Sequence, residues 1–257
     1  MPINTKAIQL GEFAGYTGQK DFAIAVGYAA GQYNQATYSI SIGLNAGKTN
    51  QLENSIAIGN GAGSSQQSTY SVALGNDTGH IAQGTRAVAV GPQAGYVTQG
   101  INAVAVGNMA GSDSQGVSSV AIGDSAGYAN MKNYAIGIGY RAGYQSMGTN
   151  SIAIGTNAGY TNMDENSIVL NATGTFLNSN GNNSLTIAPI ASKTGSKVLV
   201  YNTSTKEVSN MNNIIGNLSD VSITSPVNSQ FLQYNGTNWI NATFAGIGSS
   251  LSSLNDV

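Results

Sequence analysis

A glycine recurs every sixteen residues between positions 11 and 155 of this chain, and no copy gains or loses a residue. A second glycine follows each of them four residues later, from Gly15 to Gly159. A fixed period of this length indicates a solenoid, in which one structural unit stacks on its copies. We therefore predict about ten coils, one for each of Gly11, Gly27, Gly43, Gly59, Gly75, Gly91, Gly107, Gly123, Gly139 and Gly155.

Each copy carries branched apolar residues one and three positions before its first glycine, with small residues between and before them, as in S-I-A-I-G at 55–59. Alternation with a period of two and β-branched side chains predict a short strand. An Ala-Gly pair such as Ala62 and Gly63 is placed where a second segment would return after a turn. Parallel strands lie about 4.8 Å apart, so ten coils would form a rod about 48 Å long.

We expect the branched residues to form apolar ladders inside the coils, and the small residues to lie where neighbours come close. Two large apolar side chains per coil contribute little against the entropy lost by ordering sixteen residues. A single chain is therefore expected to be marginally stable, and chains are expected to associate side by side.

The repeat S-I-A-I-G-x-x-A-G resembles the heads of YadA-type trimeric adhesins and repeats in viral fibre proteins, over about residues 5–173. The resemblance implies an all-β fold, a left-handed parallel β-roll in which three chains pack around one axis. Handedness and the homotrimer follow from the resemblance and not from the spacing. The period of sixteen exceeds the usual head repeat of that family. The turns should therefore be larger, and their surface need not bind the same ligands.

The pattern changes after an eleventh copy, which has Asn171 in place of the first glycine. We predict a roll over residues 1–174, a β-hairpin transition over 175–213 and the start of tandem shaft modules over 214–257. Antiparallel strands are expected at 185–190 and 197–201. The segment 168–208 resembles the region that follows such coils in large-virus and marine-phage fibres, and N-G-T-N-W at 235–239 resembles phage tail-fibre shaft modules, which implies a trimeric shaft.

The shaft phrase L-S-D-V at 218–221 returns as L-N-D-V at 254–257, so the second module is truncated and the natural protein is expected to continue. Within the first module, Asn235 and Gly236 are predicted to form a hairpin turn flanked by Tyr234 and Trp239.

Composition excludes several classes of partner. Only 8% of residues are charged, the net charge is -2, and residues 1–160 hold six basic and six acidic side chains. No positive field exists to hold nucleic acid or an anionic membrane. No apolar run is long enough to cross a bilayer, and residues 1–10 lack a signal-peptide pattern, which counts against a complete autotransporter. Cysteine is absent, so neither disulfides nor thiolate metal sites brace the fold.

No constellation of residues predicts catalysis. His80 is the only histidine and lacks an orienting partner in the sequence, so we interpret it as a solvated loop residue. The acids Asp77, Asp113, Asp124, Asp164 and Glu165 are scattered along the chain, which does not suit calcium. The glycines recur as turns between strands rather than as a phosphate loop. We predict no enzyme activity, no cofactor and no metal.

Tyrosine follows the second glycine at Tyr16 and Tyr96 and in three successive copies at Tyr128, Tyr144 and Tyr160. The last three are expected to form a ladder along one side of the roll. Aromatic side chains bind sugars and proteins well, so this ladder is a candidate receptor platform. The simpler interpretation, which we favour, is that the rings stack and shield the backbone.

These features predict a non-enzymatic structural and adhesive segment of a viral or phage fibre or spike, on the virion surface. Its expected partners are two further copies of itself, neighbouring fibre or virion subunits, and a glycan or protein on the host surface. Three alternatives remain open: the head of a bacterial trimeric autotransporter adhesin, a filament protein that binds only itself, and a glycan depolymerase.

Overall fold

A computed structural model describes residues 6–190, 197–212, 221–228 and 230–243 of the chain. All regular secondary structure in these ranges is β, with no helix. Two compact units are present, one up to residue 190 and one from residue 191 onwards. The predicted all-β class and the parallel solenoid are confirmed.

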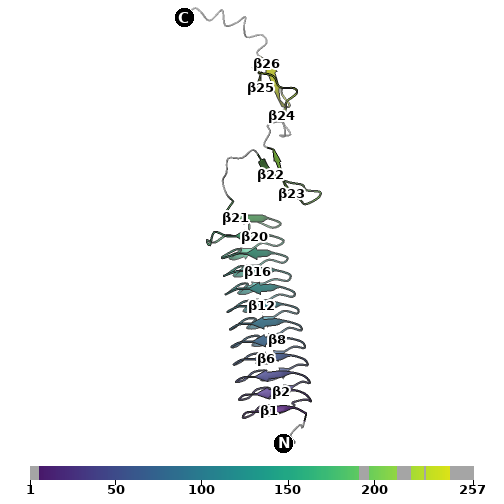
Figure 1. The fold of residues 1–257 in the computed structure, drawn as a ribbon, viewed down its shortest axis with the longest axis vertical. Helices are drawn as coiled ribbons and strands as arrows, with labels where there is room; N and C mark the ends of the chain where they lie inside the picture. Colours follow the sequence, from purple (N-terminus) through teal and green to yellow (C-terminus); the bar gives the residue numbers. More distant parts are fainter. Residues whose placement is uncertain (1–5, 191–196, 213–220, 229, 244–257) are drawn as a thin grey trace, which may run out of the picture. The chain divides into compact units, whose positions relative to one another are not determined.

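The first unit is a stack of coils built on two parallel sheets (Figure 1). The first sheet contains the strands predicted from the branched residues, and two further ones. Its twelve strands, in spatial order, are β1 (Ile8–Leu10), β2 (Ile24–Val26), β4 (Ile40–Ile42), β6 (Ile56–Ile58), β8 (Val72–Leu74), β10 (Val88–Val90), β12 (Val104–Val106), β14 (Val120–Ile122), β16 (Ile136–Ile138), β18 (Ile152–Ile154), β20 (Ile168–Asn171) and β21 (Leu185–Ala188).

The second sheet lies in the polar segments between the repeats, which the sequence analysis did not assign to strands. Each of its nine strands is three residues long, and only the third side chain is buried in every one. The strands are β3 (Tyr33–Gln35), β5 (Thr49–Gln51), β7 (Ser65–Gln67), β9 (Ile81–Gln83), β11 (Val97–Gln99), β13 (Asp113–Gln115), β15 (Ala129–Met131), β17 (Gln145–Met147) and β19 (Thr161–Met163). Each full coil therefore contributes one strand to each sheet.

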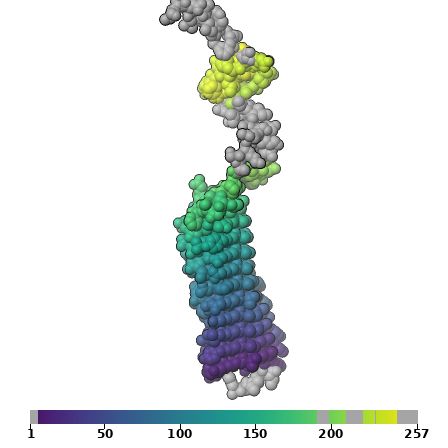
Figure 2. Space-filling view, turned by 60° about the vertical axis from the view of Figure 1, so that its left-hand side comes forward, coloured from purple at the N-terminus to yellow at the C-terminus, as the bar shows by residue number. Residues whose placement is uncertain are grey.

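The register between coils equals the sequence period. Val88 pairs with Val104, and Val104 with Val120, each sixteen residues further on. The first glycine of the repeat is required by this close stacking. At Gly107 φ is 129°, and a Cβ atom there would lie 2.6 Å from the carbonyl oxygen of Gly123. The coils pack so closely that they appear as parallel ridges on the surface of the roll (Figure 2).

The interior of the roll is built from small side chains. From β2 to β18 the central residue of each strand in the first sheet, such as Ala57 or Ala105, is fully buried, as is the alanine before the second glycine in most coils, such as Ala62 or Ala110. The branched residues on either side of the central alanine point to the outer surface of the sheet and are half-buried or exposed. The expectation that they form ladders inside the coil is therefore wrong. Side chains alternate across a strand, and it is the alanine that faces inward.

A column of buried glutamines lies opposite these alanines, at the last position of the second-sheet strands. We call it the glutamine ladder; it comprises Gln35, Gln51, Gln67, Gln83, Gln99 and Gln115. Half-buried Gln19, which lies before the first of these strands, continues the ladder by donating to the side-chain oxygen of Gln35 at 3.0 Å. The amide nitrogen of Gln67 donates to the side-chain oxygen of Gln83 at 3.1 Å and to the carbonyl oxygen of Ile56 at 2.7 Å. Between Gln35 and Gln51 the hydroxyl of Ser41 relays the contact. The buried amides are thus paired along the stack.

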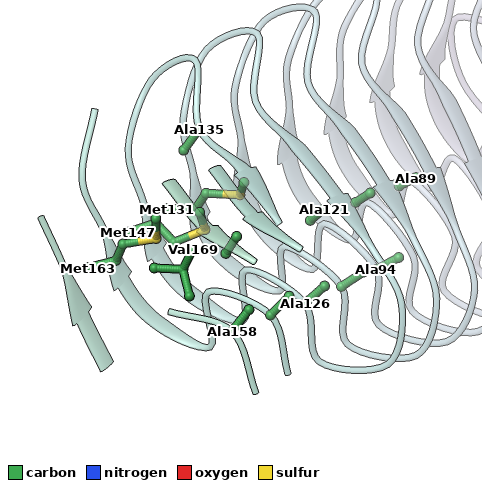
Figure 3. Close-up of a cluster of buried hydrophobic side chains, with 14 residues drawn as sticks. Ala89, Ala94, Ala121, Ala126, Met131, Ala135, Met147, Ala158, Met163 and Val169 are labelled. Atoms are coloured by element: carbon green, nitrogen blue, oxygen red, sulfur yellow. The ribbon is translucent and has the colours of Figure 1, made fainter. Parts of the chain in front are cut away.

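The ladder ends abruptly, and methionine takes the same position in the next three coils. Met131, Met147 and Met163 form a buried methionine column that packs against Ala126, Ala158 and other alanines between the two sheets (Figure 3). The amide nitrogen of Gln115 donates only to the backbone carbonyls of Val104 and Ser119. One end of the core is therefore held by amide hydrogen bonds and the other by apolar packing.

The roll continues beyond residue 174. Asn171 extends β20 and is 4% exposed, and its amide nitrogen donates to the carbonyl oxygens of Thr156 and Thr175. After this change β21 pairs in parallel with β20, with Ile168 opposite Leu185 at a spacing of seventeen. The expectation of an antiparallel strand at 185–190 is wrong, because the excursion between the strands returns the chain to the same sheet edge.

The second unit contains two small antiparallel pairs. β22 (Lys197–Tyr201) pairs with β23 (Val208–Asn212), as predicted for a hairpin. β25 (Gln230–Tyr234) pairs with β26 (Trp239–Thr243), and β24 (Val221–Ser222) adds in parallel to β26. Residues 235–238 form the predicted turn: Asn235 N–H donates to the Asn238 carbonyl at 3.0 Å, and Gly236 has a φ of 97°. The predicted boundary at 213 and the repeated phrase at 254–257 lie outside the described residues.

Candidate functional site

The outer side of the first sheet is a continuous, partly exposed apolar surface, which we call the apolar face. It consists of two columns of branched side chains that run the length of the roll. In the column that runs from Leu10 to Ile187, Ile42, Leu74 and Ile154 are 38%, 43% and 42% exposed. The two columns are Ile8, Ile24, Ile40, Ile56, Val72, Val88, Val104, Val120, Ile136, Ile152, Ile168 and Leu185, and Leu10, Val26, Ile42, Ile58, Leu74, Val90, Val106, Ile122, Ile138, Ile154, Leu170 and Ile187.

A continuous surface of this kind is unusual on a soluble monomer, where large exposed apolar patches mark interaction sites. Isoleucine, leucine and valine carry no polar group that could act chemically on a ligand. The apolar face can therefore serve for association and not for catalysis.

The predicted tyrosine ladder is confirmed as a set of stacked rings, which we call the aromatic stack: Tyr128, Tyr144, Tyr160 and Phe176. The ring centroids of Tyr128 and Tyr144 are 5.0 Å apart, those of Tyr144 and Tyr160 are 5.1 Å apart, and those of Tyr160 and Phe176 are 4.3 Å apart. The planes of the three tyrosines differ by only 12° and 7°. Inner rings have both faces covered by neighbours, so they present edges and hydroxyl groups outward. Their receptor-facing role stays a prediction.

The other two tyrosines at this repeat position lie apart from the aromatic stack. Tyr16 packs edge-on against Phe13 and Tyr33 in the first coils, and Tyr96 stacks on His80. The sequence position alone therefore does not determine ring packing. Neighbouring coils must both carry an aromatic residue for a stack to form.

A cation lies beside the aromatic stack, and the sequence analysis did not single it out. The guanidinium carbon of Arg141 is 5.0 Å from the ring centroid of Tyr140 and 5.6 Å from that of Tyr144. The Nε atom of Arg141 is buried and makes no hydrogen bond within the described residues. The sequence signal that could have identified this cation is an arginine two residues after the first glycine of the repeat, between two tyrosines.

His80 is less solvated than the sequence suggested. Its Nδ1 atom is 2.9 Å from the carbonyl oxygen of Gly61, and its ring stacks on Tyr96 with centroids 5.2 Å apart. The Nδ1 atom is also 3.5 Å from a carboxylate oxygen of Asp77. Because a carbonyl oxygen only accepts, the Nδ1 atom carries the proton in this contact. The interpretation as a solvated residue is therefore corrected to a packed turn residue.

The acidic residues serve local structure. The Asp164 carboxylate accepts from the Ser179 hydroxyl at 2.6 Å and from Gly181 N–H at 3.0 Å, which anchors the excursion between β20 and β21. Asp124 accepts from Ser125 at 2.6 Å and from Asn108 at 3.3 Å. Within the ranges that the structure describes, no group of three histidine or acidic side chains could hold a metal ion.

Comparison with protein-family models, with curated protein sequences and with solved structures gives no match to this chain. A helix long and apolar enough to cross a membrane is absent from the described parts of the chain.

Proposed function

We propose that this chain is a non-enzymatic structural and adhesive segment of a viral or phage fibre or spike, a left-handed β-roll that works as a homotrimer. The observation that carries the proposal is the apolar face. It runs along the whole roll and has no partner within the described chain, while the interior is already filled by alanine, glutamine and methionine. We infer that such a surface is covered by other chains.

The size of the apolar face suits a stable interface. An aliphatic side chain that is about two fifths exposed offers on the order of 60 Å² of apolar surface, or roughly 1.5 kcal/mol when covered. The seven exposed members of the column from Leu10 to Ile187 provide on the order of 400 Å² at this rate, and its half-buried members and the column from Ile8 to Leu185 add to this area. Standard protein interfaces bury about 800 Å² on each partner. The choice of three chains rests on the resemblance to trimeric adhesin heads.

In such a trimer the apolar faces turn towards the common axis, and the second sheet and the turns face outward. These outer residues are polar and carry few charges of either sign. Each turn occurs once per chain, so three chains present three copies of every local surface. Multivalent contact of this kind makes weak single sites act together on a host glycan or protein. The same repeated geometry suits contact with neighbouring fibre or virion subunits.

Light scattering of the purified chain tests the assembly. We expect a particle with three times the chain mass of 26.2 kDa. Ile138→Asp places a carboxylate on the apolar face, where Ile138 is 37% exposed, and should dissociate the particle because the charge would be buried unpaired.

Thr49→Asp is the matched control, because it adds the same charge to the outer side of the second sheet. Native Asp113 occupies the same repeat position there. A β-rich monomer for the unmodified chain, or a trimer that tolerates Ile138→Asp as well as Thr49→Asp, would overturn the assembly.

Attachment of intact trimers to host cells tests the adhesive part. Replacement of Tyr128, Tyr144 and Tyr160 by alanine should reduce attachment if the aromatic stack faces a receptor. Unchanged attachment by a folded trimer would leave only a structural role for the stack. An ordered end-to-end polymer without cell binding would favour a self-binding filament instead.

A further inference from the structure

We infer that the turn around Arg141 binds the carboxylate of an acidic sugar. This inference rests on the proposed function, because it names the chemical class of host ligand that the outward-facing surface recognises. It differs from the tyrosine platform in placing the contact on an arginine and on Tyr140.

The position of Arg141 in the coil is a tight turn, two residues after the first glycine. Arg141 has a φ of 52°, and its N–H donates to the carbonyl oxygen of Asp124 at 2.9 Å in the coil before. The other coils carry Ala29, Asn45 or other side chains at this position, and none of them is basic. The backbone of the turn therefore does not require arginine, and the cation needs a separate explanation.

The guanidinium of Arg141 is packed but has no counter-ion. It lies within 6 Å of two tyrosine rings, its Nε atom is buried, and it makes neither an ion pair nor a hydrogen bond with the described residues. Asp124, whose backbone carbonyl accepts from Arg141 N–H, has its carboxylate bound by Ser125 and Asn108. A cation that has lost part of its water without gaining a partner is costly, and an anionic ligand removes that cost.

The surroundings narrow the class of anion. Because Nε is buried, a ligand reaches the two terminal nitrogens, whose spacing matches the two oxygens of a carboxylate. The guanidinium lies over the Tyr140 ring, which is still 44% exposed, so the apolar side of a sugar ring can rest on the uncovered part of this ring. The aromatic stack offers little such surface, because its inner rings cover one another. Balanced charges along residues 1–160 provide no field for nucleic acid or an anionic membrane.

The test measures binding of tetragalacturonate to the assembled protein by saturation-transfer NMR, with the methyl-esterified tetrasaccharide as the uncharged counterpart. We expect the acid to bind and the ester to bind at least tenfold more weakly, since a charge-assisted bidentate contact is lost. Arg141→Ala should produce the same loss. Alanine suits this turn, because Ala29 occupies the equivalent position at the same φ of 52°. Arg141→Lys should recover little, because lysine cannot form the bidentate contact.

Arg86→Ala is the matched control. Arg86 lies 5.9 Å from the ring centroid of Tyr70 and has contact with one ring only, so its loss should leave binding unchanged. Asp124→Asn removes a neighbouring negative charge and should raise affinity for the acid about twofold or more.

Equal binding of acid and ester, or equal effects of the two arginine variants, would overturn the inference. Competition by acetate at the concentration that displaces the tetrasaccharide would reduce the site to a general anion site and would also overturn it. These failures are distinct from failure of the proposed function. If Arg141→Ala trimers still attach to host cells, the fibre assignment stands and only the acidic-sugar site is lost.

Discussion

Replacement of Gln67 by methionine is the sharpest test of how the core of the roll is held together. The methionine column shows that methionine fits this repeat position, so the change alters hydrogen bonding more than volume. The substitution removes the donors to Ile56 and Gln83 and the acceptor for Gln51. Gln51 keeps the Ile40 carbonyl at 2.8 Å, whereas the side-chain oxygen of Gln83 is left buried without a donor.

A buried acceptor without a partner costs about 1 to 3 kcal/mol, and each lost hydrogen bond adds about 1 kcal/mol. With three hydrogen bonds lost and one acceptor left unpartnered, we expect Gln67→Met to lower the free energy of unfolding by about 4 to 6 kcal/mol. The reverse change at the end of the glutamine ladder, Met131→Gln, should stay within about 1 kcal/mol of the unmodified protein. The new amide would accept from Gln115 and donate to the backbone, as Gln115 itself does now.

Urea denaturation followed by circular dichroism measures both variants, at one fixed protein concentration because association affects apparent stability. Native-state hydrogen exchange then locates the loss, which should centre on the coils between residues 51 and 83. Equal stability of Gln67→Met and the unmodified protein would refute the reasoning. So would a greater loss for Met131→Gln than for Gln67→Met.

Two further substitutions test the stacking of the coils. Gly107→Ala should destabilise the roll by more than about 3 kcal/mol or prevent folding, because the added Cβ atom would clash with the Gly123 carbonyl oxygen. Gly174→Ala, with no atom within 4 Å of the added carbon, should cost only about 1 kcal/mol, and equal losses in thermal denaturation would contradict the clash. Tyr144→Ala should cost about 1 to 3 kcal/mol through two lost ring contacts, while Tyr144→Phe should stay within about 0.5 kcal/mol. A comparable melting temperature for these two variants would show that ring stacking contributes nothing.

The sequence contains enough information to predict the period, the parallel register and the first sheet. Glycine must recur wherever the carbonyl oxygen of the next coil comes too close for a Cβ atom, as at Gly107 and its equivalents. The spacing of these glycines in the sequence is therefore the spacing of the coils. The hairpin at 230–243 was also predictable, since an Asn-Gly pair such as Asn235 and Gly236 between two strands is typical of a tight hairpin turn.

The direction of the side chains in the first sheet could not be predicted from alternation alone. A strand of the type I-A-I has two faces, and a single-chain argument places the larger residues inside. The structure places Ala57 inside and Ile56 and Ile58 outside. The interface that we propose on the outer face would account for this preference, and a single-chain sequence argument contains no information about such an interface.

The second sheet and the Arg141 site were missed for different reasons. In β7 the only buried side chain is Gln67, and a polar residue gives no hydrophobic periodicity. The signal was instead the recurrence of glutamine every sixteen residues in an otherwise variable segment. Arg141 gave a weaker signal, since its significance depends on ring distances and on the lack of a hydrogen bond from Nε to any described residue, which only coordinates supply.

The change from glutamine to methionine after Gln115 also limits how the length of this protein can evolve. Duplication of one sixteen-residue unit would lengthen the rod by about 4.8 Å without altering the contacts of the other coils. A copied glutamine coil keeps its side-chain amide partners only among other glutamine coils, and a copied methionine coil has methionine on both sides only among Met131, Met147 and Met163. The roll therefore has two kinds of sixteen-residue unit, glutamine coils and methionine coils. Length variants should gain or lose units inside either group, while a single junction between the glutamine coils and the methionine coils is kept.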